Sequence, residues 1–483
     1  MTNLSGANLN NGAAVGPQGE GRESPSSFPA YLEYKDSGLE WLEEVPSDWT
    51  VSKLGYFFRE PPCYGVLVPD FDPDGVPMLR ITDMEHEFID TSGLVTISAS
   101  LSAQYSRTII KKGDVVLSLV GTIGKAFEVG PKLAGVNLSR AIARIQLDSN
   151  TLPRYLCWIF QSCEFTHFID LVCRGTAQRV LNLSELNAFN FTFPSYLEQC
   201  AISRFLDHET ARIDALITEQ QRLIELLKEK RQAVISHAVT KGLDPTVPMK
   251  DSGVEWLGEV PAHWAVSPLK FLVEEKVAGP YGASLTKAMY TDSGYRVYGQ
   301  QQVISDDFSI GDYYISEEKF SEMQRYVVCP GDVLVSVMGT VGRVSVVPVG
   351  VEVGVINPRL VRYKFASSKV VPEFVKILLM SLRYQSRLRE ESQGSTMEGL
   401  NMVILGDLPL VLPPLDAQHP VVAFVKSYDS NFNKLVSQAT SAVDLLQERR
   451  SALISAAVTG KIDVRGWQPP ASAPTPELAQ EAV

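Results

Sequence analysis

The residues best suited to chemistry are polar side chains that occur in two similar loops. One loop contains Thr122 and Lys125, the other contains Thr340 and Arg343, and each follows an apolar run. Both have the pattern Gly-Thr-Ile/Val-Gly-Lys/Arg. Backbone N–H groups and a cation in such a loop can hold a phosphate. A β-hairpin turn, in which the glycines merely permit the turn, is the alternative.

Side chains that recognise base edges lie near both loops. Asn137 and Arg140 occur in the first copy, and Asn357 and Arg359 occur in the second. Arginine, asparagine and glutamine can pair with bases through two hydrogen bonds. The candidate DNA-contacting residues are Arg80, Thr122, Lys125, Arg140, Arg174, Thr176, Gln178, Arg179, Gln300, Gln301, Gln302, Thr340, Arg343, Arg359, Gln393, Ser395 and Thr396.

The differences between the two copies bear on which of these candidates contact DNA. The copies differ most at 77–84 and 296–303, where two related domains that recognise different sequences would differ. Drift of surface loops explains that difference almost as well, and solvated loops are the alternative for each candidate. If the two copies recognise different sequences, Arg174→Ala is expected to impair recognition by the first copy without changing the fold.

Patterns typical of enzymes are missing from the sequence. The loop at 119–126 has Leu119 where a phosphate-binding loop needs glycine and Ala126 where it needs Ser or Thr. Glu60-Pro61-Pro62-Cys63 lacks the aromatic residue of a methyltransferase base-binding loop. The six cysteines and six histidines show no metal-ligand spacing. We therefore expect no catalytic residue, no metal and no cofactor bound by this chain.

The elements that must position these loops are duplicated along the chain. Asp-Ser-Gly-x-Glu-Trp-Leu begins at Asp36 and again at Asp251, and Gly-Asp-Val begins at Gly113 and Gly331. Ile-Ser-x-Ala-Val-Thr at 235–240 has a counterpart at 454–459. The spacing between copies is about 219 residues. Two homologous units therefore fill the chain.

Composition restricts the class of protein. The 483 residues are 45% hydrophobic, and no apolar run approaches the roughly 18 residues that a membrane span needs. No secretory leader is recognisable, so we expect a cytoplasmic protein without membrane contact. A formal charge of −12 argues against nucleic-acid binding by bulk electrostatics alone.

The patterning predicts a mixed α/β (α+β) globule in each unit, followed by a long helix. The nearly continuous apolar stretches 155–160 and 374–380 favour core helices, with short buried strands as the alternative. Apolar residues then recur at steps of four and three over 202–234 and 421–453. The predicted seam contains Leu216, Leu223, Leu227, Leu435, Leu446 and Leu453.

Neither long helix can bury its seam alone. The simplest packing is an antiparallel coiled coil that acts as a spacer of roughly 50 Å. Helices folded back on their own globules are the alternative. Leu223→Asp is expected to disturb folding or assembly, because it would bury a charge in the seam.

Together, the paired openings, the Gly-Asp-Val blocks and the helix ends resemble the specificity subunit of a type I restriction-modification system. The resemblance covers about residues 29 to 466. It implies two pseudo-symmetric target-recognition domains, each of which recognises half of a split DNA site. It also implies that the helices set the gap and dock the partner subunits.

The same resemblance implies the partners and cofactors. The partners would be double-stranded DNA, two methyltransferase subunits and the restriction subunits. S-adenosylmethionine, ATP and Mg would be bound by those subunits, and this chain would be a non-catalytic recognition subunit. A recognition subunit of a type II-like fused restriction-methylation enzyme, a stand-alone enzyme and a structural scaffold are the alternatives.

The expected domain limits follow from the patterns and the resemblance. They are a disordered tail at 1–28, a first recognition domain at 29–197, a central helix at 198–244, a second recognition domain at 245–415, a C-terminal helix at 416–463 and a disordered tail at 464–483. The target sequence and gap length do not follow from the sequence.

Overall fold

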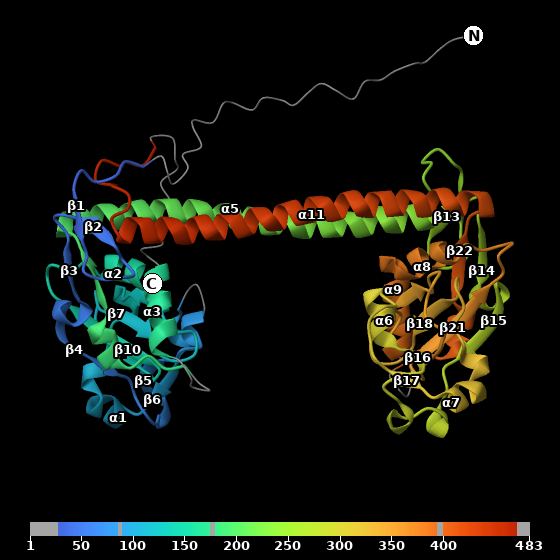
Figure 1. The fold of residues 1–483 in the computed structure, drawn as a ribbon, viewed down its shortest axis with the longest axis horizontal. Coiled ribbons are helices and arrows are strands. Elements are labelled where there is room, and N and C mark those ends of the chain that lie inside the picture. The colour runs from blue at the N-terminus through green and yellow to red at the C-terminus, as the bar shows by residue number, and fades with distance from the viewer. Residues whose placement is uncertain (1–27, 86–88, 174–178, 394–398, 471–483) are drawn as a thin grey trace, which may run out of the picture. The chain divides into compact units, whose positions relative to one another are not determined.

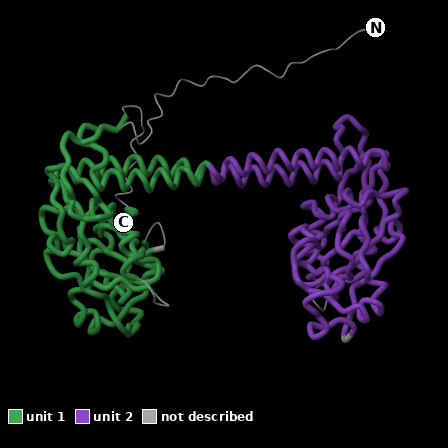
Figure 2. Tube along the Cα trace, in the orientation of Figure 1, with its two compact units in different colours: residues 1–219, 442–483 green, residues 220–441 purple. Residues whose placement is uncertain are grey.

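The computed structural model describes residues 28–85, 89–173, 179–393 and 399–470. The chain forms two compact units, one made of residues 1–219 and 442–483 and the other of residues 220–441 (Figure 2). The division passes through both long helices, so each unit contains part of each helix.

Unit 1 is built on two small sheets (Figure 1). The first has the order β4 (Phe58–Tyr64), β10 (Ile142–Leu147), β7 (Val115–Ser118) and β8 (Ala126–Glu128), all antiparallel. The second has the order β6 (Val95–Ile97), β5 (Phe71–Leu79) and β9 (Asn137–Leu138), in which β5 and β9 are parallel. Helices α1 (Ala99–Gln104), α2 (Pro153–Phe160), α3 (Cys163–Val172) and α4 (Leu183–Ala188) complete the globule.

Unit 2 repeats this plan. Its four-stranded sheet has the order β15 (Val273–Ala278), β21 (Leu360–Phe365), β18 (Val333–Ser336) and β19 (Val344–Val346). Its three-stranded sheet has the order β17 (Tyr314–Ile315), β16 (Tyr295–Tyr298) and β20 (Gly354–Ile356), with β16 and β20 parallel. Its helices are α6 (Gln300–Ser305), α7 (Glu317–Glu322), α8 (Pro372–Met380), α9 (Leu382–Gln393) and α10 (Met402–Asp407). The mixed, duplicated fold is therefore confirmed.

Short β-ribbons open each unit. Unit 1 has β1 (Tyr34–Asp36) with β2 (Glu44–Pro46), and β3 (Thr50–Lys53) with β11 (Asn190–Phe193). Unit 2 has β12 (Met249–Asp251) with β13 (Glu259–Pro261), and β14 (Ala265–Pro268) with β22 (Pro409–Leu412). The second ribbon of each unit joins the start of the globule to the chain just before a long helix.

The predicted core helices are confirmed. Every residue from Tyr155 to Phe160 in α2 is buried, and α8 buries Phe374, Val375, Leu378 and Leu379. A proline at the first position begins each helix, where its missing N–H costs no hydrogen bond.

The long helices are α5 (Tyr196–Lys241) and α11 (Leu415–Val458), and they complete both cores. In unit 1 the core includes Ile202 of α5 and Leu453 of α11. In unit 2 it includes Ile235 of α5 and Val421 of α11. The beginning of one helix thus lies with the end of the other in each unit, which is the predicted antiparallel arrangement.

The phase of the predicted seam needs correction. Leu216, Leu223 and Leu435 are 46%, 43% and 51% exposed. Each is followed by a second apolar residue, Ile217, Ile224 or Val436, which is less exposed. Leu227 and Leu446 are half-buried and Leu453 is buried, as a seam requires. The seam between the two helices therefore contains Ile217, Ile224 and Val436 in place of Leu216, Leu223 and Leu435.

A buried ion pair recurs in the four-stranded sheet of both units. Its arginine lies in β10 or β21, and its aspartate directly precedes β7 or β18. Asp114 accepts a 2.6 Å bond from Nε of Arg144, and Asp332 accepts a 3.1 Å bond from Nη1 of Arg362. All four side chains are at most 8% exposed. The aspartate of each Gly-Asp-Val motif therefore has a structural role.

The C-terminal tail begins later than predicted. Val464 is buried, Arg465 lies over the ring of Tyr31, and Trp467 packs against Phe205 and His208. Residues 464–470 thus belong to the folded part of unit 1, whereas 1–27 and 471–483 lie outside the described residues.

A matched pair of helix variants tests the corrected seam. Ile213→Asp should lower the free energy of unfolding by more than about 3 kcal/mol, because Ile213 is buried in the core of unit 1. Leu216→Asp should change it by less than about 0.5 kcal/mol, because that side chain faces solvent. Urea denaturation measures both. A larger loss for Leu216→Asp, or for Leu223→Asp, would restore the seam expected from the sequence.

The buried pair gives a second stability prediction. Asp114→Ala leaves Arg144 buried without its carboxylate and should cost about 3–5 kcal/mol. Glu225→Ala removes the exposed pair with Lys228 and should cost no more than about 0.5 kcal/mol. The shift in the urea midpoint compares them. Equal shifts would contradict a structural role for the buried pair.

Candidate nucleic-acid interface

Chain segments that carry the candidate residues meet at one edge of unit 1. The backbone N–H of Ser139 donates to the Leu79 carbonyl at 2.9 Å, and that of Arg140 donates to the Val66 carbonyl at 2.9 Å. Three segments therefore lie side by side. They are the turn that begins at Arg80, the turn that follows β4 at Val66, and the loop that contains Arg140.

The same hydrogen-bonded row continues to two further segments. The N–H of Leu119 donates to the Ala141 carbonyl at 2.8 Å, and the N–H of Leu181 donates to the Leu119 carbonyl at 2.9 Å. The loop containing Thr122 follows the first, and Arg179 precedes the second. We name the ends of these five segments, at 66–68, 79–81, 139–141, 119–122 and 179–181, the unit 1 edge.

Unit 2 has an equivalent edge. The N–H of Asn357 donates to the Tyr298 carbonyl at 2.8 Å, the N–H of Val337 to the Arg359 carbonyl at 3.0 Å, and the N–H of Leu400 to the Val337 carbonyl at 2.9 Å. The N–H of Gly279 donates to the Leu360 carbonyl at 2.8 Å. The unit 2 edge consists of residues 279–282, 298–300, 357–359, 337–340 and 399–400.

These bonds correct one correspondence expected from the sequence. Ser139 bonds to Leu79 as Asn357 bonds to Tyr298, so Ser139 and Asn357 are equivalent. Asn137 is instead buried two residues earlier, where it accepts a bond from Thr108 at 2.7 Å and donates to Ser102 at 2.6 Å. It is a core residue.

A buried serine that the sequence analysis missed shapes both Gly-Thr loops. Ser118 Oγ donates to the Thr122 carbonyl at 2.6 Å and accepts from the Lys125 N–H at 2.9 Å. Ser336 Oγ makes the same two bonds in unit 2, at 2.5 and 3.0 Å. The available signal was the serine that ends Gly-Asp-Val-x-x-Ser in both copies.

The loop threonines, Thr122 and Thr340, are exposed. The basic residues differ in their burial and in whether they have hydrogen-bond partners. Lys125 Nζ donates to the Met84 carbonyl at 3.2 Å, and Arg343 is half-buried. Arg140 is exposed and makes no side-chain hydrogen bond or ion pair with the described residues. It is the freest cation at the unit 1 edge.

The two other arginines near this edge have acidic partners. Arg80 donates through Nε and Nη2 to Asp83 at 3.1 and 2.9 Å, and this hydrogen bonding raises the pKa of Arg80. Arg179 pairs with Asp170. Both side chains keep free N–H groups, since guanidinium has five donors.

At the unit 2 edge three candidates come together. Gln300 Oε1 accepts from Arg359 Nη1 at 3.3 Å, while Gln300 Nε2 donates to the carbonyls of Met338 and Thr340. A glutamine amide, a guanidinium and the loop backbone thus form one polar cluster.

The neighbouring glutamines have different roles. Gln302 is buried, its Oε1 accepts from the Gly299 N–H at 2.9 Å, and its Nε2 donates to the Ile310 carbonyl at 2.9 Å. The predicted DNA contact for Gln302 is therefore wrong. Gln301 is exposed, and Gln393 is exposed at the end of α9.

Arg174, Thr176, Gln178, Ser395 and Thr396 lie outside the described residues. Their predicted contacts with DNA stay predictions. The described residues contain no group of three or more His, Cys, Asp or Glu side chains placed to hold a metal ion. No helix within the described ranges is long and apolar enough to cross a membrane.

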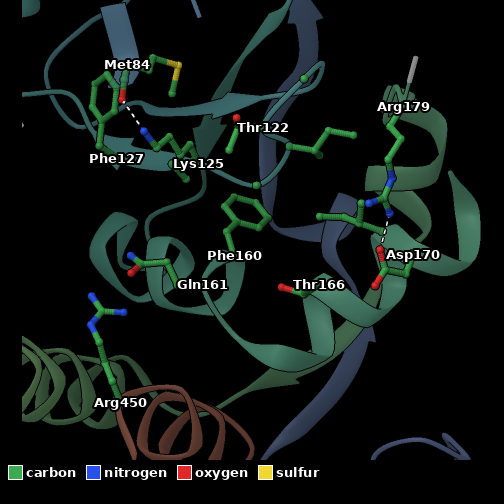
Figure 3. Close-up of a pocket in the computed structure, with 15 residues that line it drawn as sticks. Met84, Thr122, Lys125, Phe127, Phe160, Gln161, Thr166, Asp170, Arg179 and Arg450 are labelled. Carbon is green, nitrogen blue, oxygen red and sulfur yellow. Dashed lines mark hydrogen bonds and ion pairs between the residues drawn. The ribbon is translucent and has the colours of Figure 1, made fainter. Parts of the chain in front are cut away.

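A pocket of about 640 Å³ opens in unit 1 beside the Thr122 loop (Figure 3). Lys125 and Arg179 approach it from two loops and Arg450 from α11, and it is also lined by Gln161, just after α2, and by Thr166 of α3. In unit 2 Gln385 takes the place of Thr166 in the repeat and donates to the Gly342 carbonyl at 2.7 Å.

The fold and its two polar edges define a duplicated binding protein built on a helix pair. The model of the type I restriction modification DNA specificity domain matches residues 46–227 and 283–444, more than half of the chain. The chain therefore belongs to the type I restriction-modification specificity subunit family.

Curated relatives span nearly the same length. The MjaVIII specificity subunit of Methanocaldococcus jannaschii is 21% identical, over 89% of this chain and 97% of the relative. The EcoBI specificity subunit of Escherichia coli is 22% identical, over 82% and 81%. Both are described as type I restriction enzyme subunits.

Solved structures share the fold. A chain from a study of complex assembly and conformational transition of the type I R-M system matches with a TM-score of 0.63 and 16% identity, over 86% of this chain and 98% of that one. The HsdS subunit from Thermoanaerobacter tengcongensis matches with a TM-score of 0.50 and 17% identity, over 86% and 98%.

Adjacent glutamines provide a test of the assigned roles. Gln302→Ala should lower the free energy of unfolding by about 1–3 kcal/mol, because it removes a buried amide that makes two hydrogen bonds and leaves the Gly299 N–H without its acceptor. Gln301→Ala should change it by less than about 0.5 kcal/mol. Thermal unfolding of the two variants separates them, and equal stability would contradict the structural role of Gln302.

Proposed function

We propose that this chain supplies DNA sequence recognition to a type I restriction-modification complex, with each edge contacting one half of a two-part site. The observation that carries the proposal is the repeated edge. Five chain segments meet at each edge, and polar candidates lie on four of them in unit 1 and on three in unit 2. The frame of backbone hydrogen bonds that brings these segments together is the same in both units.

The differences between the edges support two different half-sites. Unit 1 presents the free cation Arg140 and the exposed Thr122, whereas unit 2 presents the Gln300–Arg359 cluster. Glutamine pairs with adenine and arginine with guanine through two hydrogen bonds, and threonine and lysine groups suit phosphates. Related frames with unlike side chains suit an asymmetric site.

The partners follow from the family and from the helix surface. We propose that α5 and α11 dock two methyltransferase subunits and set the gap between half-sites. Their exposed leucines, Leu216, Leu223 and Leu435, are available for such docking. Restriction subunits would complete the complex.

We propose that the chain itself is non-catalytic and acts in the cytoplasm. S-adenosylmethionine, ATP and Mg would then be bound by the partner subunits. The formal charge of −12 supports this division, because partners would supply much of the grip on phosphates. Tight, steeply salt-dependent DNA binding by the isolated chain would contradict it.

The relatives favour a type I system over the type II-like fused enzyme, because those quoted above are described as type I subunits. The partner in the cell decides between them. Copurification with separate modification and restriction chains supports the first, and copurification with one fused chain supports the second.

The function is tested by mapping methylated adenine across the host genome with the chain present and deleted. We expect a gapped two-part motif that disappears on deletion while the methyltransferase partner is still expressed. An unchanged motif would overturn the proposal.

A second prediction separates the half-sites. Arg359→Ala should relax one half of the motif and weaken binding by roughly 1–3 kcal/mol, since a base-contacting arginine is lost. Glu318→Ala, on α7 and outside the edge, is the control and should leave the motif unchanged. Loss of both halves with Arg359→Ala would argue for a structural role instead.

A further inference from the structure

Two consecutive apolar side chains at the unit 1 edge are largely exposed and belong to none of the buried clusters. Val66 is buried with Met78 and Ile97, but Leu67 and Val68 are 58% and 77% exposed. Exposed apolar neighbours are costly to keep in water and often mark a contact surface. Neither residue was selected by the sequence analysis.

The turn that carries them is fixed against the edge by a glycine. A Cβ on Gly65 would lie 2.1 Å from the Leu138 carbonyl oxygen, so only glycine permits this close crossing. The Val66 N–H also donates to that carbonyl at 2.7 Å, and the Val66 carbonyl accepts from Arg140. Leu67 and Val68 therefore follow a rigid anchor.

The same crossing occurs in unit 2. A Cβ on Gly279 would lie 1.9 Å from the Asn357 carbonyl oxygen. Tyr281, two residues after this glycine as Leu67 is after Gly65, is 56% exposed. Both units thus hold a large exposed side chain at one position of the edge, aliphatic in one and aromatic in the other.

The position of Arg140 beside Leu67 indicates which part of DNA the apolar side chains would contact. Arg140 lies one backbone hydrogen bond from the Leu67 turn and is free to meet a phosphate. An apolar side chain next to a phosphate-binding cation would then meet the base edges of the adjoining groove. In the major groove the apolar group on a base edge is the C5-methyl of thymine.

We infer that Leu67 and Val68 contact a thymine methyl group in the half-site of unit 1 and help to set its sequence. The inference rests on the proposed function and adds a base-contacting element to it. It requires at least one thymine in that half-site, at a position where cytosine and uracil are disfavoured.

The test uses the complete complex with its methyltransferase partner and duplexes that carry the mapped motif. Each thymine of the motif is replaced in turn by uracil, which lacks only the methyl group. With the unaltered chain, one replacement in one half-site should weaken binding roughly fourfold, the effect of one buried methyl group.

The Leu67→Ala/Val68→Ala variant should bind the thymine duplex more weakly and should be indifferent to that replacement. Val349→Ala is the matched control, because Val349 is 92% exposed and lies beyond Val347, which bonds to Asp332 at the opposite end of β18 from the edge. It should keep both the affinity and the uracil effect. Unchanged thermal unfolding verifies that each variant is folded.

Several outcomes overturn the inference. One is that the double variant keeps its full sensitivity to uracil, and another is that uracil has no effect on the unaltered complex. A third is that the double variant loses methyltransferase assembly while its DNA contacts stay intact, which would make the patch a protein-docking surface. If the unaltered complex shows no sequence preference, the proposed function fails as well. Sequence preference with an insensitive thymine leaves the function standing and removes only this inference.

Discussion

The main hydrophobic core of each unit is closed by both long helices, and this constraint governs the rest of the structure. Ile202 and Phe205 of α5 meet Leu453 and Ile454 of α11 in unit 1, while Ile235 and Val239 meet Val421 and Val425 in unit 2. Neither globule can complete its core from its own stretch of sequence. Folding of the globules and pairing of the helices are therefore coupled, and a seam mutation acts on a core as well as on the helix pair.

The exposed candidate side chains of each globule are separate from the groups that stabilise it. The frame of each edge consists of backbone hydrogen bonds and a buried serine hydroxyl, and both recur in the two units. A buried aspartate–arginine pair also recurs, at the end of β7 and of β18 that lies away from the edge. The exposed side chains on that frame differ between units. Because backbone bonds do not depend on side-chain identity, such an edge can change its contacts without losing its shape.

Much of the fold could be predicted because duplication repeated each signal. The core helix at Tyr155 was evident from continuous apolar residues, but Leu216 and Ile217 are both apolar, so periodicity could not choose the seam. Gln300 and Gln302 are the same residue type, and only the fold makes one an edge residue and the other a buried cap. Gln199 and Gln418 are buried glutamines that tie loops to the starts of α5 and α11. They recur at the repeat spacing but were missed, because glutamine is a residue type that usually lies on the surface.

We propose above that each unit recognises one half of the site, which requires the two units to act independently. The most direct measurement replaces residues 265–412, which run from β14 to β22, with the corresponding segment of a relative of different specificity and maps the methylated motif. One half of the motif should take the relative's sequence, while the other half and the gap should stay unchanged. A change in both halves, or in the gap alone, would contradict the proposal.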